Sequence, residues 1–343
     1  MVGETDPGGL TGSYARGFKA LGLSVEVADH AALIRRGVPH FLPHAGQALG
    51  QAINRPSAEH WILRRVAERQ PRLVFILKCD DLTEQFYSKL RALSPESGIA
   101  AFHPDDPFNT RGLFRRGPSH PRAKMQIRMV DRYFSWAPHL VQKARAAGAL
   151  HAAYLAFGFD AFLHAPLELT AGDRERFTAD VAFIGNWDAK REDWLTAFDG
   201  SGLRLAIWGG DYWKLRCRSK YLRSCWRGRE VIGGDFRRAV ASAKVCVNIL
   251  RPQNEGGHNM RTFEVPGCGG LLLSEWSEDQ ARHFRPDVEA VYARSPRGMA
   301  KLAKQYCEDE PAREAIRAAG HARATMETYR ERAEEVVNAV LSG

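Results

Sequence analysis

The sequence predicts an α/β protein made of two doubly wound parallel-sheet domains. Two observations lead to this prediction. Short apolar segments alternate with amphipathic segments of helical length, which is the pattern of repeated β–α units. The chain of 343 residues exceeds the usual size of one domain, and the alternation pauses once, at residues 158–177. We therefore expect an N-terminal domain at residues 1–165 and a C-terminal domain at residues 166–343, whose last helix can pack back on the first domain.

The elements of the first half follow from its apolar runs. Residues 72–78, RLVFILK, are almost wholly apolar, as expected of a strand covered on both faces. The opening MVGE resembles the end of a first strand, so we expect that strand either to start upstream of Met1 or to be short. The other expected strands are 22–29, 98–103, 132–137 and 152–157, and the expected helices are 12–21, 57–70 and 82–93.

The second half repeats the pattern after residues 158–177, whose mixed composition suits a linker. Two such α/β halves enclose a cleft, and ligands of parallel sheets bind at the carboxyl ends of the strands. The expected strands are 180–184, 203–210, 244–250 and 270–275, and the expected helices follow Asn186 and occupy 235–243, 259–269, 296–309 and 310–341.

Charge and cysteine content limit the environment of the chain. A net charge of +9 suits an anionic partner such as a nucleotide, a phosphorylated sugar, nucleic acid or an acidic membrane, although an Arg-rich composition explains it equally well. The six cysteines form no C-x-x-C pair, and Cys79, Cys246 and Cys268 adjoin apolar runs, as buried free thiols do. The sequence shows neither a signal peptide nor an apolar run of membrane-spanning length. We expect a cytoplasmic protein.

The densest pattern in the sequence is NEGGHNMRTFEVPGCGG, at residues 254–270. A helix is expected to begin there near His258 or Asn259, just after a strand. Gly256 and Gly257 would let a ligand approach the backbone, and the free N–H groups of a helix start suit a diphosphate. An ordinary helix start, with one ion pair and a glycine stop, explains the same residues.

Arg261 and Glu264 are three residues apart in this stretch, so they share one helix face. Arginine can pair with a phosphate, and a carboxylate can accept hydrogen bonds from both hydroxyls of a ribose. The sequence lacks G-x-G-x-x-G, G-x-x-x-x-G-K-[ST] and G-x-S-x-G motifs, which argues against a standard dinucleotide fold, a P-loop and an α/β-hydrolase.

The segments RTFEVPGCGGLLLSEW and HFRPDVEAVYARSPRGMAKLAKQYCEDEPAREAIRAAGHARATMETYRERA resemble the C-terminal domain of spore-maturation (CgeB-like) glycosyltransferases. These belong with the group 1 glycosyl transferases, which have the GT-B fold of two Rossmann-like domains facing a cleft. LVFILKCDDLTEQFYSKLRAL and AAFHPDDPFN are similar to the N-terminal domain of that family, and DVAFIGNWDAKR to the first strand and turn of its C-terminal domain. The resemblance spans roughly residues 70–335.

The resemblance implies transfer of a sugar from a nucleotide-sugar donor, such as a UDP-, GDP- or dTDP-sugar, to a glycan, protein or small-molecule acceptor. It favours retention of configuration, and it implies no cofactor. Group 1 members often carry two glutamates, the first on the donor sugar and the second on the ribose, which enclose one residue fewer than the eight between Glu255 and Glu264. Glu264 therefore matches the second glutamate. Glu255 matches the first if the loop absorbs one extra residue, and Arg261 is the safer partner for the leaving diphosphate.

Other donor contacts are expected in the turns that follow strands, where backbone N–H groups are free. A simple turn explains each of them equally well. No D-x-D motif occupies the strand ends of the donor domain, so we expect no metal. The additional donor-binding candidates are Gly185, Asn186, Arg191, Gly209, Gly210, His258 and Asn259.

His103, Asp105 and Asp106, in HPDDP, end a strand of the N-terminal domain, where an acceptor would lie. An inverting transferase needs a carboxylate or histidine base there, whereas Asp side chains that cap a turn explain the same motif.

Residues 214–230 carry seven basic residues before the first acid, Glu230. They suit a phosphorylated acceptor, a lipid-linked sugar or a membrane surface, and a solvated Arg-rich helix explains them more simply. Trp213, Tyr221 and Trp226 also allow a nucleic-acid interpretation. Two alternatives to a transferase therefore stay open: a non-catalytic GT-B protein that binds a nucleotide or glycan, and a basic nucleic-acid-binding protein.

Overall fold

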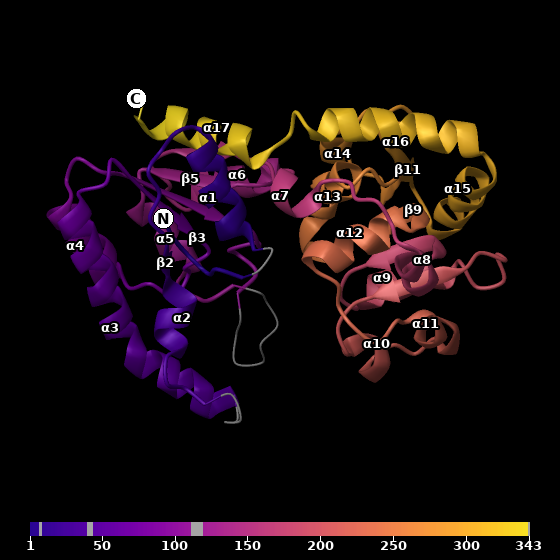
Figure 1. Ribbon diagram of the computed structural model, residues 1–343. Helices are drawn as coiled ribbons and strands as arrows, with labels where there is room; N and C mark the ends of the chain where they lie inside the picture. Colours follow the sequence, from indigo (N-terminus) through magenta and orange to yellow (C-terminus); the bar gives the residue numbers. More distant parts are fainter. Residues whose placement is uncertain (7–8, 40–43, 111–118, 342–343) are drawn as a thin grey trace. The chain divides into compact units, whose positions relative to one another are not determined.

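The computed structural model describes residues 1–6, 9–39, 44–110 and 119–341. The chain forms two compact units, one of Met1–Ala156 with Arg330–Gly343 and one of Phe157–Tyr329, here called unit 1 and unit 2 (Figure 1). Each unit holds one parallel sheet, so the predicted α/β class with two doubly wound sheets is confirmed. The chain passes between the units twice, after Ala156 and after Tyr329.

The sheet of unit 1 has the strand order β2-β1-β3-β4-β5-β6, and all its strands are parallel. The order reverses between β1 and β3. β2 is much shorter than the predicted strand at 22–29, because only its last two residues pair with β1. The strands are β1 Val2–Gly3, β2 Ala28–Asp29, β3 Leu73–Leu77, β4 Gly98–His103, β5 Arg132–Ser135 and β6 Ala152–Tyr154.

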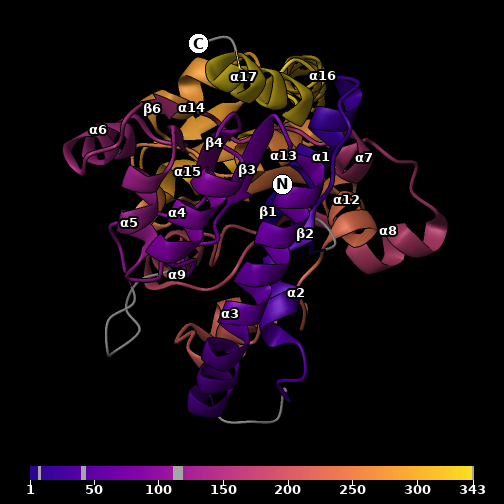
Figure 2. The same ribbon diagram turned by 90° about the vertical axis from the view of Figure 1, so that its left-hand side faces the viewer.

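Helices cover the sheet of unit 1, and the last helix of the chain is one of them (Figures 1 and 2). That helix packs against the start of β4 so closely that a Cβ atom on Gly98 would lie 2.2 Å from Val340. The chain end therefore completes the N-terminal unit. The helices are α1 Leu10–Ala20, α2 His30–Arg35, α3 His44–Arg69, α4 Glu84–Leu93, α5 Ala123–Met129, α6 Pro138–Ala146 and α17 Tyr329–Leu341.

The sheet of unit 2 has the order β11-β10-β9-β7-β8, again with all strands parallel. The chain runs from β7 outward to β8 and then returns to the other side of β7 as β9. The order therefore reverses between β7 and β9, and in such sheets the crevice at the carboxyl ends of these two strands is the usual ligand site. The strands are β7 Ala179–Ile184, β8 Leu205–Trp208, β9 Ala243–Asn248, β10 Leu272–Glu275 and β11 Val291–Ala293.

Two predictions for the second half of the chain are wrong in detail. The expected linker at 158–177 contains two short helices, whose first turns are capped by the side chains of Asp160 and Thr170. The single helix expected at 310–341 is divided into α16 and α17. The helices are α7 Ala161–His164, α8 Ala171–Phe177, α9 Ala189–Thr196, α10 Tyr212–Leu215, α11 Lys220–Cys225, α12 Gly233–Ala241, the 3₁₀ helix η1 Pro252–Asn254, α13 Arg261–Gly267, α14 Glu278–His283, α15 Pro296–Glu308 and α16 Glu310–Ala324.

The continuous apolar strands lie at the centre of each unit, as their sequences predict. β3 and β4 belong to one buried cluster in unit 1, and β7, β8 and β9 to another in unit 2. Cys79, Cys246 and Cys268 are buried free thiols, as expected. Among the helices of the described part, none combines the length and hydropathy that a bilayer-spanning segment needs.

Candidate functional site

The carboxyl ends of β7 and β9 are joined by a buried arginine. The Nε atom of Arg191, on α9, donates a hydrogen bond of 3.1 Å to the carbonyl oxygen of Ile249, and its Nη1 donates one of 2.9 Å to that of Asn186. Burial lowers the pKa of Arg191 to about 10. The side chain fixes the two loops of the switch point to each other. The guanidinium of Arg191 is engaged by both loops, and its contact with a diphosphate stays a prediction.

Arg261 and Glu264 lie in the first turn of α13, beside the end of β7. Arg261 donates from Nε to the carbonyl oxygen of Ile184 (3.2 Å) and pairs with Glu264 through Nη1. The Glu264 side chain is buried, and its other oxygen lies 3.6 Å from Nε2 of His164. The Arg261 side chain is 31% exposed, and its guanidinium carbon lies 4.5 Å from the ring centroid of Phe236. The structure thus brings the two predicted residues together and leaves the arginine partly open to a ligand.

The loop before α13 takes its shape from glycine and asparagine residues. Gly256 has a φ of +74° and open space where a Cβ atom would lie, so conformation rather than packing requires the glycine. Asn259 exchanges two side-chain hydrogen bonds with Asn248, of 2.9 and 3.2 Å. α13 begins at Arg261, two residues after the predicted start at Asn259, and Oδ1 of Asn259 accepts a hydrogen bond of 3.3 Å from the N–H of Thr262 in its first turn.

His258 is buried, and both of its ring nitrogens are engaged inside unit 2. Nε2 accepts a hydrogen bond of 3.1 Å from the backbone N–H of Phe157, and Nδ1 lies 2.5 Å from Oδ2 of Asp279. Because Nε2 is an acceptor, the proton of the neutral ring is on Nδ1 and is donated to the carboxylate. Its ring holds the loop in place, and contact of His258 with the donor stays a prediction.

The same histidine belongs to a group that could in principle hold a metal ion. Ligand atoms of His258, Asp279 and His283 all lie within 4.8 Å of one another. A metal on Nδ1 of His258 would move the ring proton to Nε2, where it would face the N–H group of Phe157. Two donors would then oppose each other in a buried place, so these residues do not fit a metal.

The glycine turns after β7 and β8 contact each other. The side-chain oxygen of Asn186 accepts a hydrogen bond of 2.9 Å from the N–H of Gly210. A Cβ atom on Gly209 would lie 2.2 Å from the carbonyl oxygen of Gly185, so only glycine fits there. The indole N–H groups of Trp213 and Trp226 donate to the carbonyl oxygens of Gly185 and Gly209, respectively. These residues therefore do turn the chain after the two strands, as the simpler interpretation expected. Their part in donor binding stays a prediction.

Glu255 lies on the exposed part of the loop, with 74% of its side chain accessible. Lys190 lies between it and the sheet, 2.7 Å from Oε1 of Glu275 and 4.0 Å from Oε1 of Glu255. From the sequence, Lys190 lies just past a Gly-Asn turn, where it could reach a diphosphate, but a solvated first helical turn is the preferred interpretation. Lys190 places a cation beside the loop that Gly256 and Gly257 form.

In unit 1, the predicted acceptor residues at the end of β4 are arranged around a buried histidine. Nδ1 of His103 lies 2.9 Å from the carbonyl oxygen of Asp105, and Nε2 lies 3.5 Å from Oδ2 of Asp80. His103 has no exposed surface. Asp105 forms an ion pair of 2.5 Å with Lys78. Asp106 accepts a hydrogen bond from the N–H of Phe108, so it caps a turn, as the structural interpretation expected.

Asp80 is the member of this group that the sequence analysis missed. Its Oδ2 accepts a hydrogen bond of 2.6 Å from the N–H of His120. Burial raises the pKa of Asp80, but hydrogen bonding and charge from His103, together with that N–H, outweigh burial and leave the pKa below its ordinary value. Its position just past β3, next to the β4 end in the sheet, was the signal that could have identified it.

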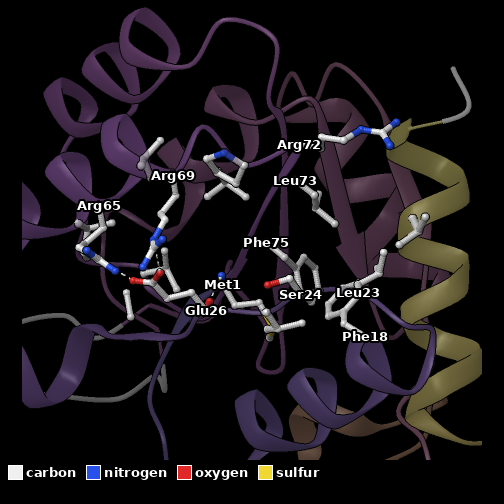
Figure 3. Close-up of a pocket in the computed structure, with 18 of the residues that line it drawn as sticks. Met1, Phe18, Leu23, Ser24, Glu26, Arg65, Arg69, Arg72, Leu73 and Phe75 are labelled. Carbon is white, nitrogen blue, oxygen red and sulfur yellow. Dashed lines mark hydrogen bonds and ion pairs between the residues drawn. The ribbon is translucent and has the colours of Figure 1, made fainter.

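Unit 1 also has a cavity of about 680 Å³ at the amino ends of its strands. Figure 3 shows Met1 and Phe75 among the residues that line it, with Glu26 beside Arg65 and Arg69 at one side. Glu26 forms ion pairs with both arginines. The cavity lies at the edge opposite His103, and we assign it no part in the site because ligands of such sheets bind at carboxyl ends.

Comparisons with known proteins bear on the family and the fold of this chain. Residues 190–338 match a family model described as "Glycosyl transferase-like". A comparison with curated protein sequences finds no match.

Solved structures of similar fold cover nearly the whole chain. Sucrose-phosphate synthase from Thermosynechococcus elongatus has a TM-score of 0.69 at 11% identity, covering 96% of this chain and 91% of that one. HepE from Anabaena, solved in complex with UDP-glucose, has a TM-score of 0.61 at 11% identity, covering 98% and 99%. The trehalose 6-phosphate synthase of Burkholderia multivorans has a TM-score of 0.58 at 14% identity, covering 97% and 83%.

These likenesses show that the chain has a glycosyltransferase-like fold of two Rossmann-like parallel-sheet domains, which is the predicted GT-B architecture. The family model and the solved structures support the resemblance to group 1 glycosyl transferases at this coarser level. The CgeB-like subtype and the cleft between the domains stay predictions.

Proposed function

We propose that this protein is a glycosyltransferase that takes a sugar from a nucleotide-sugar donor and moves it to a glycan, protein or small-molecule acceptor. The observation that carries the proposal is the Arg261–Glu264 pair at the switch point of β7 and β9, in a glycosyltransferase-like fold. Ligands of parallel α/β sheets bind at that point, and the pair offers a cation and a carboxylate on one helix turn.

The donor is held by unit 2 in this proposal. Glu264 accepts hydrogen bonds from the ribose hydroxyls, and Arg261 neutralises the diphosphate and its charge as it leaves. Backbone N–H groups beside Gly256 and Gly257 and at the start of α13 contribute without any metal. Glu255 contacts the sugar, which agrees with its exposed position.

The stereochemistry that we propose is retention. A base for an inverting reaction must reach the acceptor hydroxyl, but His103 is buried and Asp105 is paired with Lys78. A retaining reaction depends chiefly on stabilising the leaving group, which Arg261 supplies. We also propose a CgeB-like, cytoplasmic enzyme, in line with the sequence resemblance.

UDP-glucose is the first donor to test, because HepE was solved with it. We expect one of UDP, GDP, ADP or dTDP to raise the melting temperature of the full chain, and the matching sugar donor to be hydrolysed slowly without an acceptor. A nucleotide-dependent shift with no hydrolysis or transfer would indicate a binding protein instead. Failure of all four nucleotides to bind would contradict the proposal.

A further inference from the structure

The basic segment 214–230 forms a surface of unit 2 that the proposed donor site does not use. In the part of the chain that the structure describes, six of its seven basic side chains form no ion pair, whereas the seventh, Arg229, pairs with Asp235. Most other arginines of unit 2 do have carboxylate partners. The six, all exposed, are Lys214, Arg216, Arg218, Lys220, Arg223 and Arg227.

The backbone beneath these cations is firmly attached to the sheet. Trp213 and Trp226 bond to the carbonyl oxygens of the glycine turns, at 2.9 and 2.8 Å. The carboxylate of Glu192 accepts hydrogen bonds from the backbone N–H groups of Arg218 and Ser219, at 2.6 and 2.9 Å. The cations are therefore presented by an ordered surface, and binding would cost little backbone entropy.

Two large apolar side chains protrude among the cations. Leu215 is 70% exposed and Tyr212 is 52% exposed, both on α10. The guanidinium carbon of Arg216 lies 4.5 Å from the ring centroid of Tyr212. Exposed apolar and aromatic groups beside lysine and arginine are typical of surfaces that lie at a membrane interface.

The aromatic residues of the segment argue against nucleic acid. Binding of single strands uses open aromatic faces on which bases stack. Trp213 is buried, the indole of Trp226 is partly covered, and the hydroxyl of the partly buried Tyr221 donates to the carbonyl oxygen of Phe198. These three rings serve the packing of α10 and α11. The exposed ring of Tyr212 has Arg216 over it, so the described aromatic side chains of this surface form no row of open faces for stacking.

We propose that this surface, residues 212–227 on α10, α11 and the turns around them, binds an anionic membrane. The cations meet the lipid phosphates, and Leu215 enters the interface. This inference goes beyond the proposed transfer reaction and does not depend on it. A peripheral contact of this kind is reversible and weakens with salt, because counterions screen it.

The test is co-sedimentation of the full chain with vesicles of phosphatidylcholine alone and with vesicles that also contain phosphatidylglycerol. We expect binding only to the anionic vesicles. Each basic residue contributes about fivefold in partitioning, so the triple variant Arg216→Gln/Arg218→Gln/Lys220→Gln should bind about a hundredfold more weakly. Leu215→Ser should also weaken binding, with the melting temperature unchanged.

The matched control removes three exposed cations from α15, in Arg297→Gln/Lys301→Gln/Lys304→Gln, and should bind nearly as the wild type does. Met326→Ser, at another exposed apolar side chain, is the control for Leu215. Equal losses of vesicle binding in both triple variants would show that binding depends only on net charge, and this would overturn the proposal. So would equal binding to both vesicle types, or binding of single-stranded DNA in preference to anionic vesicles.

Discussion

Arg191 donates a hydrogen bond of 3.1 Å from its buried Nε to the carbonyl oxygen of Ile249, 58 residues away. Together with its bond to Asn186, this contact fixes the loops after β7 and β9 at the point where the strand order of unit 2 reverses. The rigidity of the proposed donor site therefore depends on an arginine that faces the protein interior.

Arg191→Met should lower the free energy of unfolding by about 3 kcal/mol, because it leaves buried carbonyl groups without donors. Arg191→Lys should not restore this stability, because a single ammonium group lacks the planar, forked set of N–H donors that reaches both carbonyl oxygens. Urea unfolding followed by tryptophan fluorescence measures both. Arg204→Met, at an exposed pair with Asp180, should stay within about 0.5 kcal/mol of the wild type. If Arg191→Met unfolds like this control, the bracing role is wrong.

The His258–Asp279 pair gives a second prediction, about the loop before α13. Asp279→Ala should cost about 2–3 kcal/mol, because the buried Nδ1–H group loses its charged acceptor. Asp279→Asn, which retains an oxygen, should cost less. Glu278→Ala, one residue earlier and exposed, is the matched control.

The proton position in His258 can be tested separately with metal ions. If Nδ1 carries the proton, excess Zn²⁺ or EDTA should leave the melting temperature of the full chain unchanged. A zinc-dependent rise that Asp279→Asn abolishes would show that the cluster binds metal after all.

Buried thiols predict a loss of stability at alkaline pH. Burial raises the pKa of Cys246 to about 12, from an ordinary value near 9. Below about pH 9 the thiol is protonated in both states, so its effect is constant. Between pH 9 and 12 the unfolded thiol ionises and the native one cannot, so stability falls by about 1.4 kcal/mol per pH unit for this group.

The measurement compares the unfolding free energy of the wild type and Cys246→Ala across this range. The variant should lose stability less steeply with pH, whatever its stability at neutral pH. Parallel slopes would mean that the thiol is not desolvated in the native state. Under native conditions at pH 8, Cys225, the most accessible of the six thiols, should react fastest with a thiol reagent.

Substitution of Glu255 tests the part of the site that we propose contacts the donor sugar. Because its side chain is exposed, Glu255→Gln should leave stability and nucleoside diphosphate affinity unchanged. It should lower kcat/KM for transfer by tenfold or more, since a charged hydrogen bond to the sugar contributes about 1.5–3 kcal/mol. Glu308→Gln, on α15, is the control. A normal kcat/KM would remove Glu255 from the site.

The sequence predicted the sheets better than it predicted the site. Strands such as β3 and β8 are apolar on both faces, as expected of strands in a covered parallel sheet. Helices α7 and α10 are one turn long, which is too short for a helical period of apolar residues to be visible in the sequence. Apolar and polar side chains alternate along residues 22–29, as they do in a strand. Only Ala28 and Asp29 pair with β1, however, so the strand is two residues long.

Within the site, the spacing in the sequence was sufficient to predict that Arg261 and Glu264 lie side by side, because residues three apart on a helix are neighbours. It was not sufficient for Arg191 and His258. Their partners, Ile249 and Phe157, lie 58 and 101 residues away, so only the tertiary fold shows that these side chains face inward.

The most direct measurement of the central claim is calorimetric titration of UDP, GDP, ADP and dTDP into the wild type, Glu264→Gln and Arg261→Met. One nucleotide should bind the wild type, and each variant should weaken it at least tenfold, because each loses a charge-assisted contact. Lys304→Met, a distant exposed cation, should bind normally. Unchanged affinity in both variants would place the donor elsewhere, and absence of binding to the wild type would contradict the account.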